Sequence, residues 1–227
     1  MIRSLLRNGF SIDTLIGLCA SAFVVFCTLP IHEYAHALVA TKLGDDTPRL
    51  SGRLTLNPMA HIDIMGAVMI LLVGFGYAKA VPVNPRNFKN PKAGMALTAA
   101  AGPASNLIMS VIFILLSNIS FVIYCKTNDS IVARVAFLFF FYAAMINISL
   151  AVFNLIPIPP LDGSHVIITL FGKNIPPNIL LNMQRYGYII LVVAVFVCDR
   201  LDFSPVGIVS GWLQDGIYGL MKLIFIH

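Results

Sequence analysis

Residues 14–36 read TLIGLCASAFVVFCTLPIHEYAH, so an uncharged run leads directly into two histidines and the only glutamate of the chain, Glu33. A helix places residues four apart on one face, so His32 and His36 can present their imidazoles to one metal ion. Glu33 lies about 100° around the same turn, where its carboxylate can reach a metal-bound water. This HExxH pattern at the end of an apolar helix predicts metal-dependent hydrolysis inside a membrane.

The composition places the chain in the membrane class. Of its 227 residues, 58% are hydrophobic and only 11% are charged, and the mean hydropathy is +0.87. Soluble domains carry about 25% charged residues. The net charge of +5 comes without a basic run, which argues against a nucleic-acid partner and favours loops beside an anionic lipid bilayer.

Long uncharged stretches predict an all-α polytopic membrane protein. Three of them are long enough to cross a bilayer and predict a three-span core, over about 12–42, 93–120 and 131–156. The shorter run Tyr186–Cys198 and the mixed segment Phe203–Ile226 predict one or two C-terminal helices within about 178–226. The last of these either spans the membrane or lies along its interface. We expect residues 1–227 to form a single membrane-embedded domain.

The stretch between the first two core spans is expected to return to the side that it left. Ile64–Ala78 is short and is interrupted by Gly74 and Gly76, which suits a re-entrant segment surrounded by protein or water. We therefore expect a re-entrant region over about 47–90. Within it, residues 52–57 suit either a short strand whose free edge binds an unwound substrate or a plain surface hairpin.

The loop charges favour the same topology. If Ile64–Ala78 does not cross, more lysines and arginines gather on the side of Lys42 and Lys92 than on the side of Arg3 and Arg7. The positive-inside rule then places the N-terminus outside and the end of the first span near the cytoplasmic face. We expect a multi-pass protein of a prokaryotic inner membrane.

Two local patterns have competing interpretations. Arg3 and Arg7 before an apolar run that contains Ala20-Ser21-Ala22 imitate a secretory signal, but cleavage there would cut the helix that carries the histidines, so we prefer an uncleaved span. The four cysteines show no close CxxC pairing and fall in apolar stretches. We expect buried free thiols rather than disulfides or a cysteine zinc site.

A third metal ligand is expected because a catalytic zinc takes three protein ligands and a water. A carboxylate is the usual partner of two histidines, and Asp162 follows an uncharged run in NLIPIPPLDG, residues 154–163. The prolines of this stretch end a helix and leave unpaired carbonyls, an arrangement normally found only beside a cavity or site.

Three motifs together resemble the site-2 protease family of intramembrane zinc metalloproteases. They are His32-Glu33 with His36, Ala101-Gly102-Pro103-Ala104-Ser105-Asn106, and Asn154 and Pro157 with Asp162-Gly163. They cover the chain from Thr14 to about Leu170 and are much more specific in combination than HExxH alone.

The resemblance implies that His32, His36 and Asp162 hold one Zn²⁺ per chain, with Glu33 as the general base. It also implies that the three core spans alternate in direction. Family members often carry a PDZ or CBS domain; none is visible here, so we expect a minimal member. The expected activity is hydrolysis of peptide bonds in or near the transmembrane helices of substrate proteins.

Several polar residues have open roles. The amide of Asn154 could donate to the developing oxyanion or hold substrate, and otherwise it makes an interhelical hydrogen bond. Asn106 is expected to bridge spans by packing. His61 and Asp63 suggest a polar pair that anchors the re-entrant region, or a second metal site. His165 is expected to make a structural or outer-sphere contact rather than to ligate metal.

Two other functions remain open at this point. A membrane metal-ion transporter would also place histidine and aspartate at membrane depth, although no paired halves with matching broken spans are visible. An inactive relative that only binds substrates would not need to keep its only glutamate beside the histidines. The oligomeric state is left open.

Overall fold

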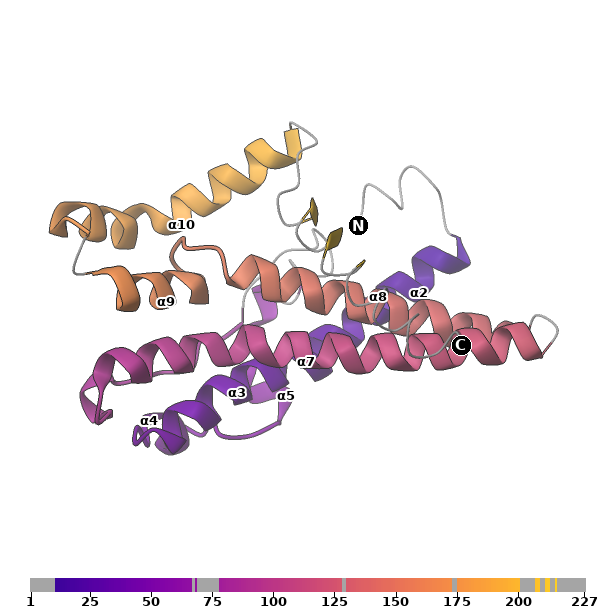
Figure 1. Cartoon of the computed structure of the whole chain (residues 1–227), viewed down its shortest axis with the longest axis horizontal. Coiled ribbons are helices and arrows are strands. Elements are labelled where there is room, and N and C mark those ends of the chain that lie inside the picture. Colours follow the sequence, from indigo (N-terminus) through magenta and orange to yellow (C-terminus); the bar gives the residue numbers. More distant parts are fainter. Residues whose placement is uncertain are drawn as a thin grey trace.

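The fold is helical and matches the predicted class. The computed structural model describes residues 11–66, 68, 78–127, 130–172, 175–200, 207, 208, 211, 212 and 215, and these residues contain no strand. The helices are α2 (Ile12–Phe23), the π-helical turn η1 (Val24–Thr28), α3 (Leu29–Lys42), α4 (Thr47–Leu50), α5 (Pro58–His61), the 3-10 turn η2 (Pro85–Asn87), α7 (Pro91–Lys126), α8 (Ile131–Asn154), α9 (Asp162–Phe171) and α10 (Pro177–Arg200) (Figure 1).

Four helical stretches among the described residues are long and apolar enough to cross a membrane: Ile12–Lys42, Pro91–Lys126, Ile131–Asn154 and Pro177–Val197. The prediction of an all-α polytopic membrane protein is therefore confirmed. The last stretch also shows that the predicted run Tyr186–Cys198 extends back to Pro177. Most of Phe203–Ile226 lies outside the described residues.

The first span is continuous but contains a widened turn just before the histidines. Ser11 caps its start by accepting a hydrogen bond from the Thr14 amide. The π-helical turn Val24–Thr28 then precedes Pro30, which has no N–H and whose ring crowds the carbonyl four residues back. A proline inside a helix commonly produces a kink, and here the widened turn accommodates Pro30 instead.

The long helices α7 and α8 run antiparallel and form the centre of the bundle with the first span (Figure 1). The Ser117 hydroxyl donates to the Phe137 carbonyl across this pair, at 3.3 Å. Small residues allow the backbones to approach closely, which is how helices associate in lipid. The central cluster consists of Val24, Phe113, Ile114, Ala143, Ala144 and Ile148.

The region between α3 and α7 begins and ends at the same end of the bundle. Asp45, fully buried just after α3, accepts hydrogen bonds from the Asn84 amide N–H and the Asn87 side chain, both at 2.7 Å, and from Thr47. These bonds outweigh the opposing effect of burial and hold the pKa of Asp45 below its usual value. Lys42 and Lys92 therefore lie at one end, in agreement with the predicted topology.

The two ends of the stretch Ile64–Ala78, which is expected to be re-entrant, lie close together, and its middle lies outside the described residues. The Lys79 amide donates to the His61 carbonyl at 2.8 Å, so the chain leaves and returns at one place. Ile62 packs against Val25 and Leu29 of the first span. Val25 and Leu29 precede the histidines along the first span, so Ile62 lies beside the apolar part of that span.

The strand expected within residues 52–57 is not confirmed. The chain there forms turns and bends between α4 and α5. Gly52 has a φ of +69°, and the Arg53 amide donates to the Pro48 carbonyl at 2.8 Å, so the backbone curls around the end of α4 instead of extending. The Arg53 guanidinium also donates to the Ala60 carbonyl and fixes the following turn.

The expectation that the cysteines are buried was wrong for those whose side chains are described. Cys19, Cys27 and Cys125 are free, as expected, but exposed on the outer faces of their helices. These faces would meet lipid in a bilayer, so an apolar segment does not imply a protein-buried side chain. The side chain of Cys198 lies outside the described residues.

Candidate metal centre

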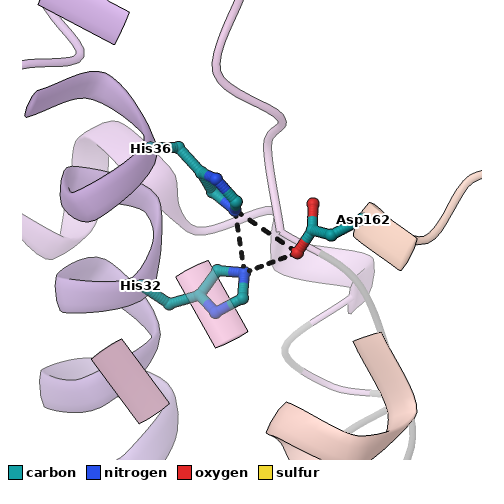
Figure 2. A group of neighbouring side chains, drawn as sticks. All are labelled: His32, His36 and Asp162. Atoms are coloured by element: carbon teal, nitrogen blue, oxygen red, sulfur yellow. Dashed lines mark hydrogen bonds and ion pairs between the residues drawn. The ribbon is translucent and has the colours of Figure 1, made fainter. Parts of the chain in front are cut away.

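Three side chains from distant parts of the chain converge at one point (Figure 2). His32 and His36 project from adjacent turns of α3, and Asp162 is the first residue of α9. The two Nε2 atoms are 3.1 Å apart, and Asp162 Oδ2 lies 3.3 Å from His32 Nε2 and 3.4 Å from His36 Nε2. The sequence predicted this trio as ligands, and the structure brings the three together.

This triangle fits a zinc ion. Tetrahedral ligands about 2.0–2.2 Å from zinc lie roughly 3.3–3.6 Å from one another, which is close to the three observed separations. Two imidazole nitrogens and a carboxylate are also the donor set of many catalytic zinc sites. With three protein ligands, the fourth position is left for water or substrate.

A hydrogen bond orients His36 for this role. Its Nδ1 lies 2.7 Å from the carbonyl oxygen of Thr98 on α7, and both groups are buried. A carbonyl can only accept, so Nδ1 carries the proton and Nε2 keeps a free lone pair that faces His32 and Asp162. Thr98 is a positioning residue that sequence reasoning missed, because its backbone makes the contact.

Gly102 is the point at which α7 touches both imidazoles. A Cβ atom there would lie 2.6 Å from His32 Nε2 and closer still to His36 Nε2. Only glycine leaves room for the histidines in this position. Gly102 belongs to the motif 101–106 that carried the resemblance, but nothing in the local sequence indicated that it contacts the imidazoles.

Asp162 is placed by the turn between α8 and α9. A Cβ atom at Gly163 would overlap the carbonyl oxygen of Leu155, so glycine lets α9 begin directly against the end of α8. The Ser164 hydroxyl donates to the Leu161 carbonyl at 2.7 Å and closes the first turn. The predicted helix break at the prolines thus has a clear purpose: it turns Asp162 back to the histidines.

Glu33 follows His32 in the chain but lies outside the group of three candidate ligands. It is 7% exposed, against 4% for His32 and 7% for His36, so all three side chains of the motif are buried. This placement is compatible with a carboxylate that acts on a metal-bound water rather than on the metal itself.

Asn154, the other predicted catalytic residue, is directed elsewhere in this structure. Its Nδ2 donates to the Leu150 carbonyl of its own helix at 3.0 Å. The alternative interhelical hydrogen bond is not seen among the described residues. Its oxyanion role therefore stays a prediction.

The remaining polar candidates do not extend the metal centre within the described part of the chain. His61 is fully buried and donates from Nε2 to the Thr55 carbonyl at 2.7 Å, whereas Asp63 accepts from the Gly66 amide. They anchor two different turns, so the predicted polar pair is not formed.

His165 is exposed, so the expected structural contact is not seen among the described residues. Asn106 is buried but forms no hydrogen bond to the described residues.

Several known proteins resemble the chain in sequence. The model of peptidase family M50 matches residues 116–195, which include Asp162. "Putative zinc metalloprotease YwhC" of Bacillus subtilis (strain 168) is 40% identical over 201 residues, which cover 85% of each chain. "Putative zinc metalloprotease Rip2" of Mycobacterium tuberculosis (strain ATCC 25618 / H37Rv) is 30% identical over 86% of this chain and 70% of its own length.

A further relative, "Putative zinc metalloprotease Rip2" of Mycolicibacterium smegmatis, is 27% identical over 73% of this chain and 62% of its own length. No solved structure matches the chain significantly. The extent of the match to the Bacillus protein and the family model agree with the resemblance seen in the three motifs. The chain belongs to peptidase family M50, the site-2 protease family of metallopeptidases.

Proposed function

We propose that this metallopeptidase is an intramembrane zinc protease that hydrolyses peptide bonds in or near the transmembrane helices of other proteins. The observation that carries the proposal is the convergence of His32, His36 and Asp162 at the end of an apolar helix. In this proposal the three residues hold one zinc ion per chain, Glu33 is the base, and the described spans act as one membrane-embedded unit.

Bound zinc would polarise the scissile carbonyl and lower the pKa of a bound water from 15.7 towards about 7. The residues of the chain handle the protons. Glu33 accepts the proton of the attacking water and delivers it to the leaving amine. Thr98 keeps the proton of His36 on Nδ1, and so prevents that imidazole from turning its N–H towards the reacting groups.

Asn154 is proposed to stabilise the developing oxyanion or to hold the substrate backbone. Its amide now donates to the Leu150 carbonyl, so this role requires a side-chain rotation that exchanges an intrahelical bond for one to substrate. Asn154→Ala should then lower kcat more than it raises KM if the contact forms mainly in the transition state.

The position of the site along the first span suggests where cleavage occurs. His32 is about 20 residues, or roughly 30 Å, from the start of the helix at Ile12, which corresponds to the far interface of a bilayer. With the N-terminus outside, the site lies near the cytoplasmic face of a prokaryotic inner membrane. A substrate helix must unwind there to expose a carbonyl, so helix-breaking residues should favour cleavage.

The proposal is tested by purifying the chain in detergent, counting zinc and assaying a panel of transmembrane peptides. The wild type should bind one zinc per chain and cleave some of the peptides. Glu33→Gln should keep the zinc and lose turnover, because an amide cannot accept the proton. Normal cleavage by Glu33→Gln would contradict the assigned base. Metal flux into sealed vesicles that survives this substitution would instead favour a transporter.

A further inference from the structure

A layer of buried polar side chains lies between the long helices, apart from the three proposed ligands. Thr28, Asn106 and Asn147 come from η1, α7 and α8, and each is at most 1% exposed. Polar groups at membrane depth are costly unless they are paired. Each of these three side chains therefore needs a hydrogen-bond partner within the bundle.

The register of α3 against α7 places Asn106 one turn from the metal centre. His36 contacts Thr98 through its Nδ1, and the next turn brings His32 against Gly102. Each step of four residues back along the first span matches a step of four forward along α7. Continuing by one turn, or about 6 Å, brings Asn106 to the level of Thr28, directly beside the turn that carries His32.

The register of α7 against α8 brings Asn147 to nearly the same level. Ser117 contacts Phe137, so ten residues back along α7 corresponds to ten residues forward along α8. Asn147 thus lies at the level of the turn of α7 that begins at Asn106. Its Nδ2 donates one hydrogen bond to the Ala143 carbonyl at 2.8 Å, whereas its oxygen has no partner among the described residues.

Four buried atoms in this layer and at the adjacent candidate ligand His32 have no hydrogen-bond partner among the described residues: His32 Nδ1, both amide atoms of Asn106 and Asn147 Oδ1. An unpaired buried polar atom costs about 1–3 kcal/mol, so such a group is normally satisfied by a buried water. These atoms include both a hydrogen-bond donor and hydrogen-bond acceptors. His32 must carry its proton on Nδ1 if Nε2 faces a metal, and the two amide oxygens are acceptors.

We propose that Asn106 is a positioning residue of the metal centre, which holds a buried water between α3, α7 and α8. The water accepts a hydrogen bond from the Nδ1–H of His32 and donates to the amide oxygens of Asn106 and Asn147. It thereby orients His32 in the way that the Thr98 carbonyl orients His36. This inference depends on the zinc site of the proposed function.

The experiment compares Asn106→Ala with Asn106→Ser in the full-length protein. The two replacements have nearly the same size, but only serine keeps a hydroxyl that can bind the water. Zinc affinity is measured by chelator competition, and thermal unfolding is measured on the zinc-free protein. Ser110→Ala is the control, because the Ser110 hydroxyl is buried one turn further along α7 and donates to the Leu107 carbonyl of its own helix.

Asn106→Ala should weaken zinc affinity about 10–100-fold, as loss of an outer-sphere partner of a metal ligand does. Asn106→Ser should stay within a few-fold of the wild type, as should Ser110→Ala. If Asn106 only packs, Asn106→Ala and Asn106→Ser will show equal zinc affinities, and their zinc-free forms will lose similar stability. That result would overturn the inference. A wild type that binds no zinc would instead defeat the proposed function, so the two failures are distinct.

Discussion

The two halves of the metal centre are held in different ways. The helix half, His32 and His36, is presented by one regular helix, and α7 approaches it through Thr98 and Gly102. The turn half, Asp162, arrives after a break between α8 and α9 and depends on the close approach of Gly163 to Leu155. The comparison shows that helical spacing places two of the proposed ligands, whereas tertiary packing places the third.

The largest effect is expected at the helix half, from Gly102→Ala. The added methyl would overlap both imidazoles, and no movement of a single flexible side chain relieves this. Zinc affinity should fall by at least about 100-fold, the upper end of what outer-sphere changes cost, and peptide cleavage should fall with it. Chelator competition on the purified variant measures the loss.

Gly17→Ala is the matched control on the first span. A Cβ atom at residue 17 meets only Tyr142, at 4.0 Å, which is ordinary van der Waals contact. This variant should bind zinc like the wild type. Equal zinc affinity in Gly102→Ala and Gly17→Ala would show that α7 does not limit the space around the histidines.

A smaller effect is expected at the turn half, from Gly163→Ala. The methyl would push α9 away from the Leu155 carbonyl and move Asp162, while the two imidazoles stay in place. Zinc affinity should drop by about 10-fold or more. Gly172→Ala, whose Cβ would lie 3.6 Å from Ile168, is the control at the other end of α9. If Gly163→Ala lost more affinity than Gly102→Ala, the order of the two halves would be reversed.

The parts of the site that could be predicted from the sequence follow the same division. HExxH gave His32, Glu33 and His36 because helical periodicity is local. Asp162 could be predicted only because zinc needs a third ligand and because the motifs resemble a family. The contacts of Thr98 and Gly102 could not be predicted, since no local pattern tells which face of an apolar helix meets an imidazole.

The fold, too, could be predicted from the sequence only in part. Long uncharged runs predicted the spans, because the bilayer dictates length and composition. They could not predict that Cys19 and Cys27 face outward, because both faces of a membrane helix are apolar. Residues 52–57 suited a strand, but Gly52 and the Pro48 carbonyl close a turn there instead.

The smallest effect on zinc affinity is expected from Asp45→Asn, because Asp45 belongs to neither half of the metal centre. Loss of the charge weakens the bonds from Asn84, Asn87 and Thr47, and should lower the free energy of unfolding by about 2 kcal/mol while zinc affinity changes little. Unfolding of the purified variant in detergent measures the first quantity, and chelator competition measures the second.

The loss of stability caused by Asp45→Asn should become smaller as the pH falls into the acid range. The pKa of Asp45 is lowered on folding, so its stabilisation is fully present above the unfolded value of about 4 and is lost as the pH falls through the folded value. The difference in stability between wild type and variant should therefore be constant near neutral pH and shrink in acid. A difference that grows as the pH falls below 4 would contradict this account of Asp45.

The zinc K-edge absorption spectrum of the purified, zinc-loaded wild type tests the convergence of the two halves most directly. The account predicts one zinc per chain with two imidazole nitrogens and a carboxylate oxygen at about 2.0–2.2 Å, and loss of the oxygen contribution from the protein in Asp162→Ala. A shell that contains sulfur, or one that is unchanged in Asp162→Ala, would contradict it.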